Sequence, residues 1–221
     1  MKNASLKLQK GENLIILGKS GTGKSVLIKC LVKLIEPDAG ELILLGTNIT
    51  DMDDGELNEV RKKTGFLFQG AALYDSMTVR ENLEFPLREA RIKKKEMNPM
   101  VEEALKNVGL LEAIDKMPAE LSGGMRKRVG LARALILNPE IMLYDEPTTG
   151  LDPITSKEIS KLVLETQKKY NTSSIIITHD MACAKITSNR ILVLNDGAFI
   201  AEGSYDELQQ SPNKLVSCFF E

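Results

Sequence analysis

Residues 18–25, with the sequence GKSGTGKS, constrain the fold of this 221-residue chain more than any other segment. An apolar run, residues 14–17, precedes them directly, and a run typical of a helix, residues 26–35, follows. The segment fits the P-loop pattern G-x-x-x-x-G-K-[ST] in the strand–loop–helix setting that the pattern requires. Its glycines allow backbone N–H groups to surround phosphate oxygens at a helix N-terminus. The segment therefore predicts a site for a nucleotide phosphate.

The side chains of the P-loop predict two further contacts with a nucleotide. Lys24 would reach the β- and γ-phosphates, and the Ser25 hydroxyl would hold Mg²⁺. A Gly-rich turn without a ligand is the alternative interpretation. We expect the whole loop to contact the nucleotide, that is, Gly18, Lys19, Ser20, Gly21, Thr22, Gly23, Lys24 and Ser25.

Composition excludes several classes of protein. With 43% hydrophobic and 27% charged residues, the chain is typical of a soluble globular protein of one domain. A net charge of −2 gives no indication of nucleic-acid binding. The three scattered cysteines fit no zinc or disulfide pattern, which predicts reduced thiols in a cytosolic protein. No stretch approaches the roughly 18 apolar residues of a membrane-spanning helix. We therefore expect any membrane role to need a partner.

Short apolar runs alternate with helical patterns along most of the chain. The patterns predict strands over residues 5–8, 13–17, 41–45, 65–69, 141–144 and 174–178, and helices over residues 24–35, 56–63, 123–137, 154–170 and 181–186. Asn171 is placed to end the helix before it. A hairpin is predicted for residues 191–194 and 198–201 across Asn195-Asp196-Gly197. Such alternation predicts an α/β fold whose mostly parallel sheet is covered on both faces.

The middle of the chain lacks strand signals. Thr78 with Glu81 three residues later forms a capping-box pattern, so a helix is predicted to begin there. Residues 100–108 follow the pattern of another amphipathic helix. We expect residues 76–120 to form a helical insert.

An apolar run, residues 141–144, ends in the carboxylates Asp145 and Glu146. In open α/β folds, ligands bind at the carboxyl ends of the strands. Asp145 would act on Mg²⁺, and Glu146, pointing elsewhere, would polarise an attacking water as a general base. An ordinary acidic pair at the end of a strand is the alternative.

A second phosphate nest is predicted at the start of the next helical run. Ser122 stands at the N-cap position, and Gly123 and Gly124 follow it. A hydroxyl and free N–H groups at a helix N-terminus can bind phosphate. The two nests are about 100 residues apart, and one nucleotide cannot easily use both within a compact monomer. A head-to-tail dimer resolves this, because each nest would then close over the P-loop of the other chain.

His179 is the single histidine, and it follows the Ile-rich run 175–178. A lone histidine is often structural. This one ends a predicted buried strand at the sheet edge expected for the P-loop, Asp145 and Glu146, which favours a γ-phosphate sensor.

The order of these motifs resembles the ATP-binding cassette (ABC) ATPases over the whole chain. It runs from the P-loop through Gln69 at a strand end, LSGG at residues 121–124, Asp145-Glu146 and Leu151-Asp152 to His179. The resemblance implies a P-loop NTPase with a RecA-like core over residues 1–75 and 136–221. A helical subdomain over residues 76–135 would carry the LSGG motif. The whole chain, residues 1–221, would form a single ABC ATPase domain with an antiparallel β-subdomain.

The resemblance also implies roles for the site residues. The catalytic residues would be Lys24, Gln69, Glu146 and His179; the Mg²⁺ ligands Ser25, Gln69 and Asp145; and the residues completing the ATP site across the dimer Ser122, Gly123, Gly124 and Asp152. Residues 70–87 would receive a coupling helix from an integral membrane permease. The protein would be peripheral on the cytoplasmic face of the inner membrane.

Within the family, LSGGMRKRVGLARAL looks most similar to the ATPases of Mla/MCE-type lipid transporters. Met125 is the distinguishing residue, because most ABC proteins carry Gln or Glu there. This similarity implies an MCE-domain substrate-binding protein as a further partner. The alternatives are an ATPase for lipoprotein release, cell division or amino-acid import, a non-transport ABC protein, and a regulatory module without hydrolysis.

The segment before the P-loop departs from the family pattern. ABC ATPases carry more residues there, including an aromatic residue that stacks on adenine, whereas residues 1–17 contain no aromatic residue. We therefore expect a truncated N-terminus and a β-subdomain that lacks one or two strands; the alternative is that a nearby residue takes the place of the aromatic residue.

Overall fold

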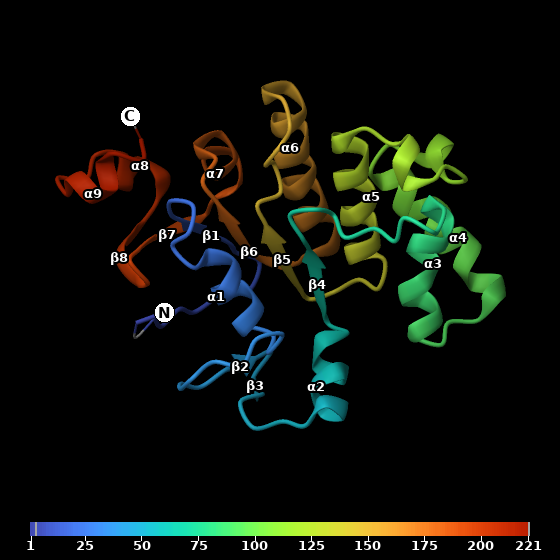
Figure 1. The fold of residues 1–221 in the computed structure, drawn as a ribbon, viewed down its shortest axis with the longest axis horizontal. Coiled ribbons are helices and arrows are strands. Elements are labelled where there is room, and N and C mark those ends of the chain that lie inside the picture. The colour runs from blue at the N-terminus through green and yellow to red at the C-terminus, as the bar shows by residue number, and fades with distance from the viewer. Residues whose placement is uncertain (3, 221) are drawn as a thin grey trace.

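Six strands form the central sheet of the computed structural model, which describes residues 1–2 and 4–220 (Figure 1). Their order across the sheet is β4 (Thr64–Leu67), β5 (Ile141–Asp145), β6 (Ser173–Thr178), β1 (Asn13–Leu17), β7 (Arg190–Asn195) and β8 (Ala198–Gly203). Neighbours from β4 to β7 are parallel, and β8 is antiparallel to β7. The loops that follow β1, β4, β5 and β6 therefore leave the same edge of the sheet.

Helices cover both faces of this sheet. On one face lies α1 (Lys24–Cys30), and on the other lie α5 (Gly123–Leu135), α6 (Pro153–Tyr170) and α7 (Met181–Thr187). Strand β1 is buried throughout because it contributes to both layers, with Ile16 in the core under α1 and Ile15 and Leu17 in the other. Continuous apolar runs are what strands covered on both faces require.

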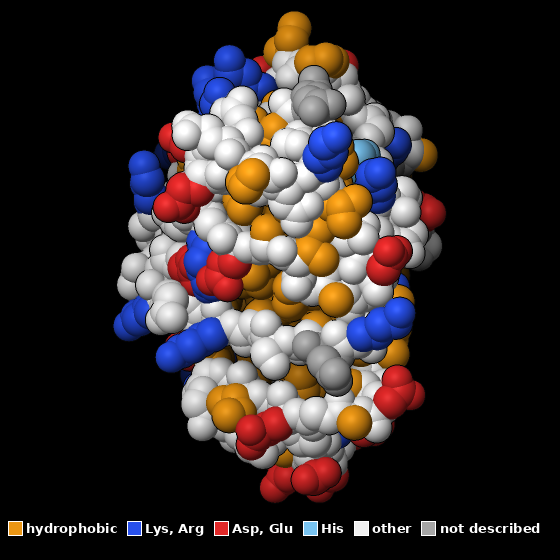
Figure 2. Space-filling view, turned by 90° about the vertical axis from the view of Figure 1, so that its left-hand side faces the viewer, with side chains coloured by type: hydrophobic (Ala, Val, Ile, Leu, Met, Phe, Trp, Pro, Cys, Tyr) orange, Lys and Arg blue, Asp and Glu red, His pale blue; other side chains and the backbone are white. Residues whose placement is uncertain are grey.

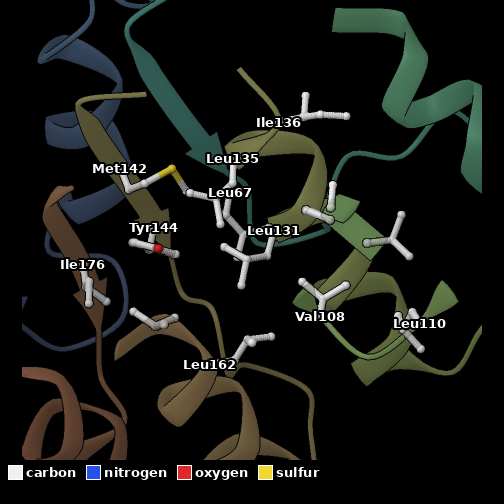
Figure 3. Close-up of a cluster of buried hydrophobic side chains, with 14 of the residues drawn as sticks. Leu67, Val108, Leu110, Leu131, Leu135, Ile136, Met142, Tyr144, Leu162 and Ile176 are labelled. Carbon is white, nitrogen blue, oxygen red and sulfur yellow. The ribbon is translucent and has the colours of Figure 1, made fainter. Parts of the chain in front are cut away.

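The larger core lies between the sheet and helices α5 and α6 (Figure 3). Leu67 of β4 and Tyr144 of β5 point toward Leu131 of α5 and Leu162 of α6. Figure 1 places α3 (Val79–Glu89) and α4 (Lys94–Asn107) beyond α5, away from the sheet. Two short 3₁₀ helices, Leu111–Ala113 and Pro118–Glu120, lead from α4 to α5.

Smaller elements complete the described chain. A two-stranded antiparallel sheet consists of β2 (Ile43–Leu44) and β3 (Thr47–Asn48), and α2 (Asp54–Arg61) follows it. After β8 come the short helices α8 (Tyr205–Gln209) and α9 (Lys214–Ser217). No helix of the described residues is both long and apolar enough to cross a membrane.

Three local predictions are confirmed. Thr78 and Glu81 form the capping box that begins α3. Asn171 ends α6 with a left-handed φ of 51°, which an asparagine tolerates better than most residues. Asp196 and Gly197 join β7 to β8 with φ values of 47° and 80°, as a tight hairpin turn requires.

The strand predicted over residues 5–8 is wrong. Burial alternates as in a strand, because Leu6 and Leu8 are half-buried and Ser5 and Lys7 are exposed. No backbone ladder joins this segment to another described strand, so alternation alone does not make it part of a sheet. Figure 2 shows the side on which Figure 1 places the N-terminus, and hydrophobic side chains gather across the middle of this face. The predicted strand over residues 41–45 is likewise reduced to Ile43–Leu44.

Three other elements are shorter than predicted, among them α5, which ends at Leu135 instead of residue 137. Helix α1 ends at Cys30 instead of residue 35, because Lys33 takes a left-handed φ of 51° and its ammonium donates to the Thr50 carbonyl. Strand β4 ends at Leu67, and Gln69 lies in the turn that follows it.

Candidate active site

The P-loop connects β1 to α1 and holds its lysine inside the loop. Gly21 and Gly23 have φ values of 82° and 93°, a conformation that favours glycine. Lys24 is only 6% exposed, and its Nζ donates to the carbonyls of Gly18 and Lys19 at 2.7 and 3.0 Å. The ammonium thus lies inside the P-loop. It can donate to phosphate oxygens in place of these two carbonyls.

Ser25 and Asp145 meet at the edge between α1 and β5. The Ser25 hydroxyl donates to Asp145 Oδ1 at 3.1 Å. Burial raises the pKa of the Asp145 carboxyl, and the Ser25 hydrogen bond opposes this rise. A hydroxyl beside a carboxylate is an oxygen donor set of the kind that Mg²⁺ prefers, so these two residues fit the predicted metal. Gln69 is exposed, and within the described chain its side chain bonds to neither of them.

Glu146 follows β5 directly and is the most heavily contacted carboxylate of the site. Its φ of 50° is rare for a residue other than glycine. The carboxylate is 7% exposed: Oε1 lies 3.5 Å from Lys24 Nζ, and Oε2 lies 2.9 Å from His179 Nδ1. Oε2 also accepts from the Thr149 hydroxyl at 3.1 Å. The prediction that Lys24, Asp145, Glu146 and His179 share one sheet edge is confirmed, and their chemical roles remain predictions.

The second nest begins α5. Ser122 Oγ accepts from the Met125 N–H at 3.2 Å, as an N-cap does. Gly124 must be glycine for packing, because a Cβ there would lie 2.5 Å from Thr155 Cγ2 of α6. Asp152 caps α6 by accepting from the N–H groups of Ile154 and Thr155, both at 3.0 Å. In the described residues, no hydrogen bond or ion pair joins Ser122, Gly123 or Gly124 to the P-loop, and Asp152 bonds only within its own turn.

Lys127 is a site residue that sequence reasoning missed. It is 5% exposed, and its Nζ donates to the carbonyls of Gln69 at 2.5 Å and Glu146 at 3.1 Å. Burial lowers its pKa to about 8, and the charges of Asp145 and Glu146 oppose this fall. The one available signal was its place one helical turn after the LSGG motif.

Comparison with known sequences identifies the family. The sequence model described as ABC transporter matches residues 1–149, which is more than half of the chain. This chain belongs to the ABC transporter family. This ABC protein is 40% identical over 222 residues to the glycine betaine/proline betaine transport system ATP-binding protein ProV of Escherichia coli. The alignment covers 100% of this chain and 56% of ProV. The chain is 39% identical over 218 residues to the probable ribonucleotide transport ATP-binding protein mkl of Mycobacterium leprae, covering 98% of this chain and 61% of mkl.

A solved structure extends the likeness to the fold. The dimeric post-hydrolysis structure of the ATP-binding cassette MJ0796, bound to ADP and Pi, matches this ABC protein with a TM-score of 0.85 at 34% identity. The match covers 93% of this chain and 90% of MJ0796. The predicted P-loop fold, with a mostly parallel sheet, a small antiparallel sheet and helical insertions, is confirmed. The chain spans about three fifths of the length of the curated relatives it matches.

Proposed function

We propose that this ABC protein binds and hydrolyses ATP and thereby powers transport through a separate membrane permease. The observation that carries the proposal is the Glu146 carboxylate. It lies 3.5 Å from the P-loop lysine and 2.9 Å from the imidazole of His179. A carboxylate beside the phosphate-binding lysine can accept a proton from an attacking water. Its hydroxyl and imidazole contacts fix its direction.

Each residue of the site has its own role in phosphoryl transfer. The backbone of residues 20–24 and the Lys24 ammonium bind the phosphates, and Glu146 orients the water. His179 holds both Glu146 and the γ-phosphate. Mg²⁺, when bound, neutralises charge on the phosphates, and Ser25, Gln69 and Asp145 would hold it. Positioning and charge stabilisation supply most of the acceleration in such a reaction.

The second nest supports a head-to-tail dimer. Ser122, Gly123 and Gly124 are not bonded to the P-loop of their own chain, and MJ0796 is a dimer with ADP and Pi. In the dimer, these residues of one chain close over the γ-phosphate bound to the other, and Asp152 lies at the interface. Loss of the γ-phosphate charge then reopens the dimer. Residues 70–87 pass this movement to the permease, which keeps the protein on the cytoplasmic face of the inner membrane.

The proposal includes two alternative classes of transported substrate. The LSGG-Met125 sequence favours lipid transport of the Mla/MCE type, with an MCE-domain partner. The names of ProV and mkl, which refer to transport of betaines and of ribonucleotides, favour transport of small polar solutes. ATPase assays of the complex with its permease would decide. Stimulation by phospholipid but not by glycine betaine supports the first, and the reverse result supports the second.

The ATPase proposal is tested by replacing Glu146 with Gln. The wild-type chain is expected to release phosphate from ATP in the presence of Mg²⁺. Glu146→Gln should lower kcat by roughly 10²- to 10⁴-fold, because it removes the general base, while ATP affinity stays the same. Near-normal turnover by this variant would remove Glu146 from that role.

A further inference from the structure

Lys127 is a buried cation that the ATPase proposal does not use. Lys24 and Lys127 are the buried lysines of the described chain, and Lys24 faces the phosphate site. Lys127 forms no ion pair with any described carboxylate; its Nζ donates instead to the carbonyls of Gln69 and Glu146. Burying an ammonium without a directly paired carboxylate is costly, and neutral carbonyls compensate only in part. Such a lysine points to a role besides stability.

The two carbonyls belong to two different parts of the site. Strands β4 and β5 are neighbours in the sheet, with Leu67 opposite Tyr144. Gln69 lies in the turn after β4, and Glu146 follows β5 directly. Lys127, from helix α5, therefore bridges the backbone of the two turns that present these side chains.

The bond to Glu146 falls on a residue whose backbone needs support. With a φ of 50°, Glu146 holds a left-handed conformation that few residues other than glycine adopt. Its N–H donates to the Ile177 carbonyl at 2.9 Å, and its carbonyl accepts from Lys127 at 3.1 Å and from the Thr149 N–H at 3.3 Å. These bonds fix the direction in which the Glu146 carboxylate leaves the backbone.

The bond to Gln69 is part of a wider contact along α5. Lys127, Gly130 and Arg133 are three residues apart and so lie near one another on one helix face. Gly130 packs against Ala71, and Arg133 donates to the carbonyls of Ala72 and Ala71 at 2.8 and 3.2 Å. Of these three residues, Lys127 alone bonds to Glu146 as well.

We propose that Lys127 is a positioning residue of the ATPase site. It fixes the positions of the Gln69 turn and the Glu146 backbone relative to each other and to α5. Because Ser122 caps α5, movement of the LSGG motif would reach the Gln69 turn and the Glu146 backbone together through Lys127. The inference rests on the proposed function, and Lys127 acts through Glu146 and Gln69 instead of touching ATP.

The test compares Lys127→Met with Lys127→Arg. Met keeps the length of the side chain but donates no hydrogen bond, whereas Arg keeps the charge and the donors. Lys127→Met should lower kcat by about 10- to 100-fold, as expected for a misplaced catalytic group, and leave KM for ATP unchanged. Lys127→Arg should restore most of kcat. The control is Lys161→Met on the exposed side of α6, which should behave as the wild type.

Hydrogen–deuterium exchange separates this inference from the ATPase proposal, because it needs no turnover. Lys127→Met should speed exchange in peptides covering residues 66–75 and 144–150 and leave residues 190–203 unchanged. If the wild type hydrolyses no ATP, the ATPase proposal fails and the exchange result still decides the role of Lys127. Unchanged exchange in both peptides, or a kcat equal to that of the wild type, would overturn the role.

Discussion

We propose that two helix N-termini of this chain bind phosphate, and their surroundings differ. The P-loop before α1 holds a buried lysine, with Ser25 and the carboxylates Asp145 and Glu146 around it. The N-terminus of α5 offers Ser122 and two glycines, packed against Leu151 and Thr155. The first brings an ammonium, a hydroxyl and two carboxylates together within one chain. The second has only donors, so it can add to a site but cannot form one. One reaction would therefore need the first N-terminus of one chain and the second N-terminus of another.

The largest effect is expected from removing the lysine charge at the P-loop. Lys24→Met should weaken ATP binding by about 10- to 100-fold, the effect of losing a hydrogen bond to a charged group. Equilibrium binding of ATP to the isolated chain measures this change. Lys161→Met serves as the control. Unchanged affinity in Lys24→Met would mean that the P-loop is not the ATP site.

The second N-terminus is tested by Gly124→Ala. The new Cβ would lie 2.5 Å from Thr155 Cγ2, so α5 must shift against α6 at a cost of about 1–3 kcal/mol. ATP affinity of the isolated chain should stay the same, since the P-loop is untouched, while turnover falls.

Thr155→Ser provides the matched rescue for this variant. It removes the methyl group in the way and keeps the hydroxyl that donates to Asp152 Oδ2 at 2.5 Å. The double variant Gly124→Ala/Thr155→Ser should recover thermal stability and turnover. A loss of ATP affinity in Gly124→Ala alone would contradict the separation of the two N-termini.

A smaller effect is expected at Glu12, which precedes β1 at the end opposite the P-loop and so reports on fold stability instead of site chemistry. Burial favours a higher pKa for Glu12, but hydrogen bonds from Arg190 and the Gln9 N–H, with the Arg190 charge, bring it below its usual 4.5. A lowered pKa stabilises the fold above pH 4.5, and this contribution is lost as the pH falls through the folded-state value.

Glu12→Gln should therefore lower the free energy of unfolding by about 1–2 kcal/mol at pH 7 and have little effect in stronger acid. Urea unfolding at several pH values measures the difference. Glu202→Gln, which removes the more exposed partner of Arg190, is the control and should cost less. An effect of Glu12→Gln that persists unchanged in acid would rule out the ion pair as its source.

The local features of the fold were predictable from the sequence because each depends on neighbouring residues. The glycines of the P-loop, the Thr78–Glu81 capping box and the Asp196-Gly197 turn are set by their own backbone conformations. The structure of residues 5–8 could not be predicted in this way. A strand needs a neighbouring strand to pair with, and an alternating sequence does not show whether one is present. Lys33, which ends α1 early, was missed because a distant carbonyl, that of Thr50, binds its side chain.

The candidate site likewise has a part that could be predicted from the sequence and a part that could not. Residues at strand ends could be placed at one edge, because parallel strands end together. The contact of His179 with Glu146 and the bridge made by Lys127 depend on helices and turns that are distant in sequence. Nothing in the spacing of residues 69, 127 and 146 indicates that they meet.

The most direct test of the two-chain site is to measure the mass of the Glu146→Gln variant in solution, with and without ATP. This variant should bind ATP but not turn it over, so the closed state persists. Light scattering should give about 24.4 kDa without nucleotide and twice that mass with ATP, and Gly124→Ala in the same background should weaken the dimer. A variant that binds ATP and still has the mass of one chain would contradict the account.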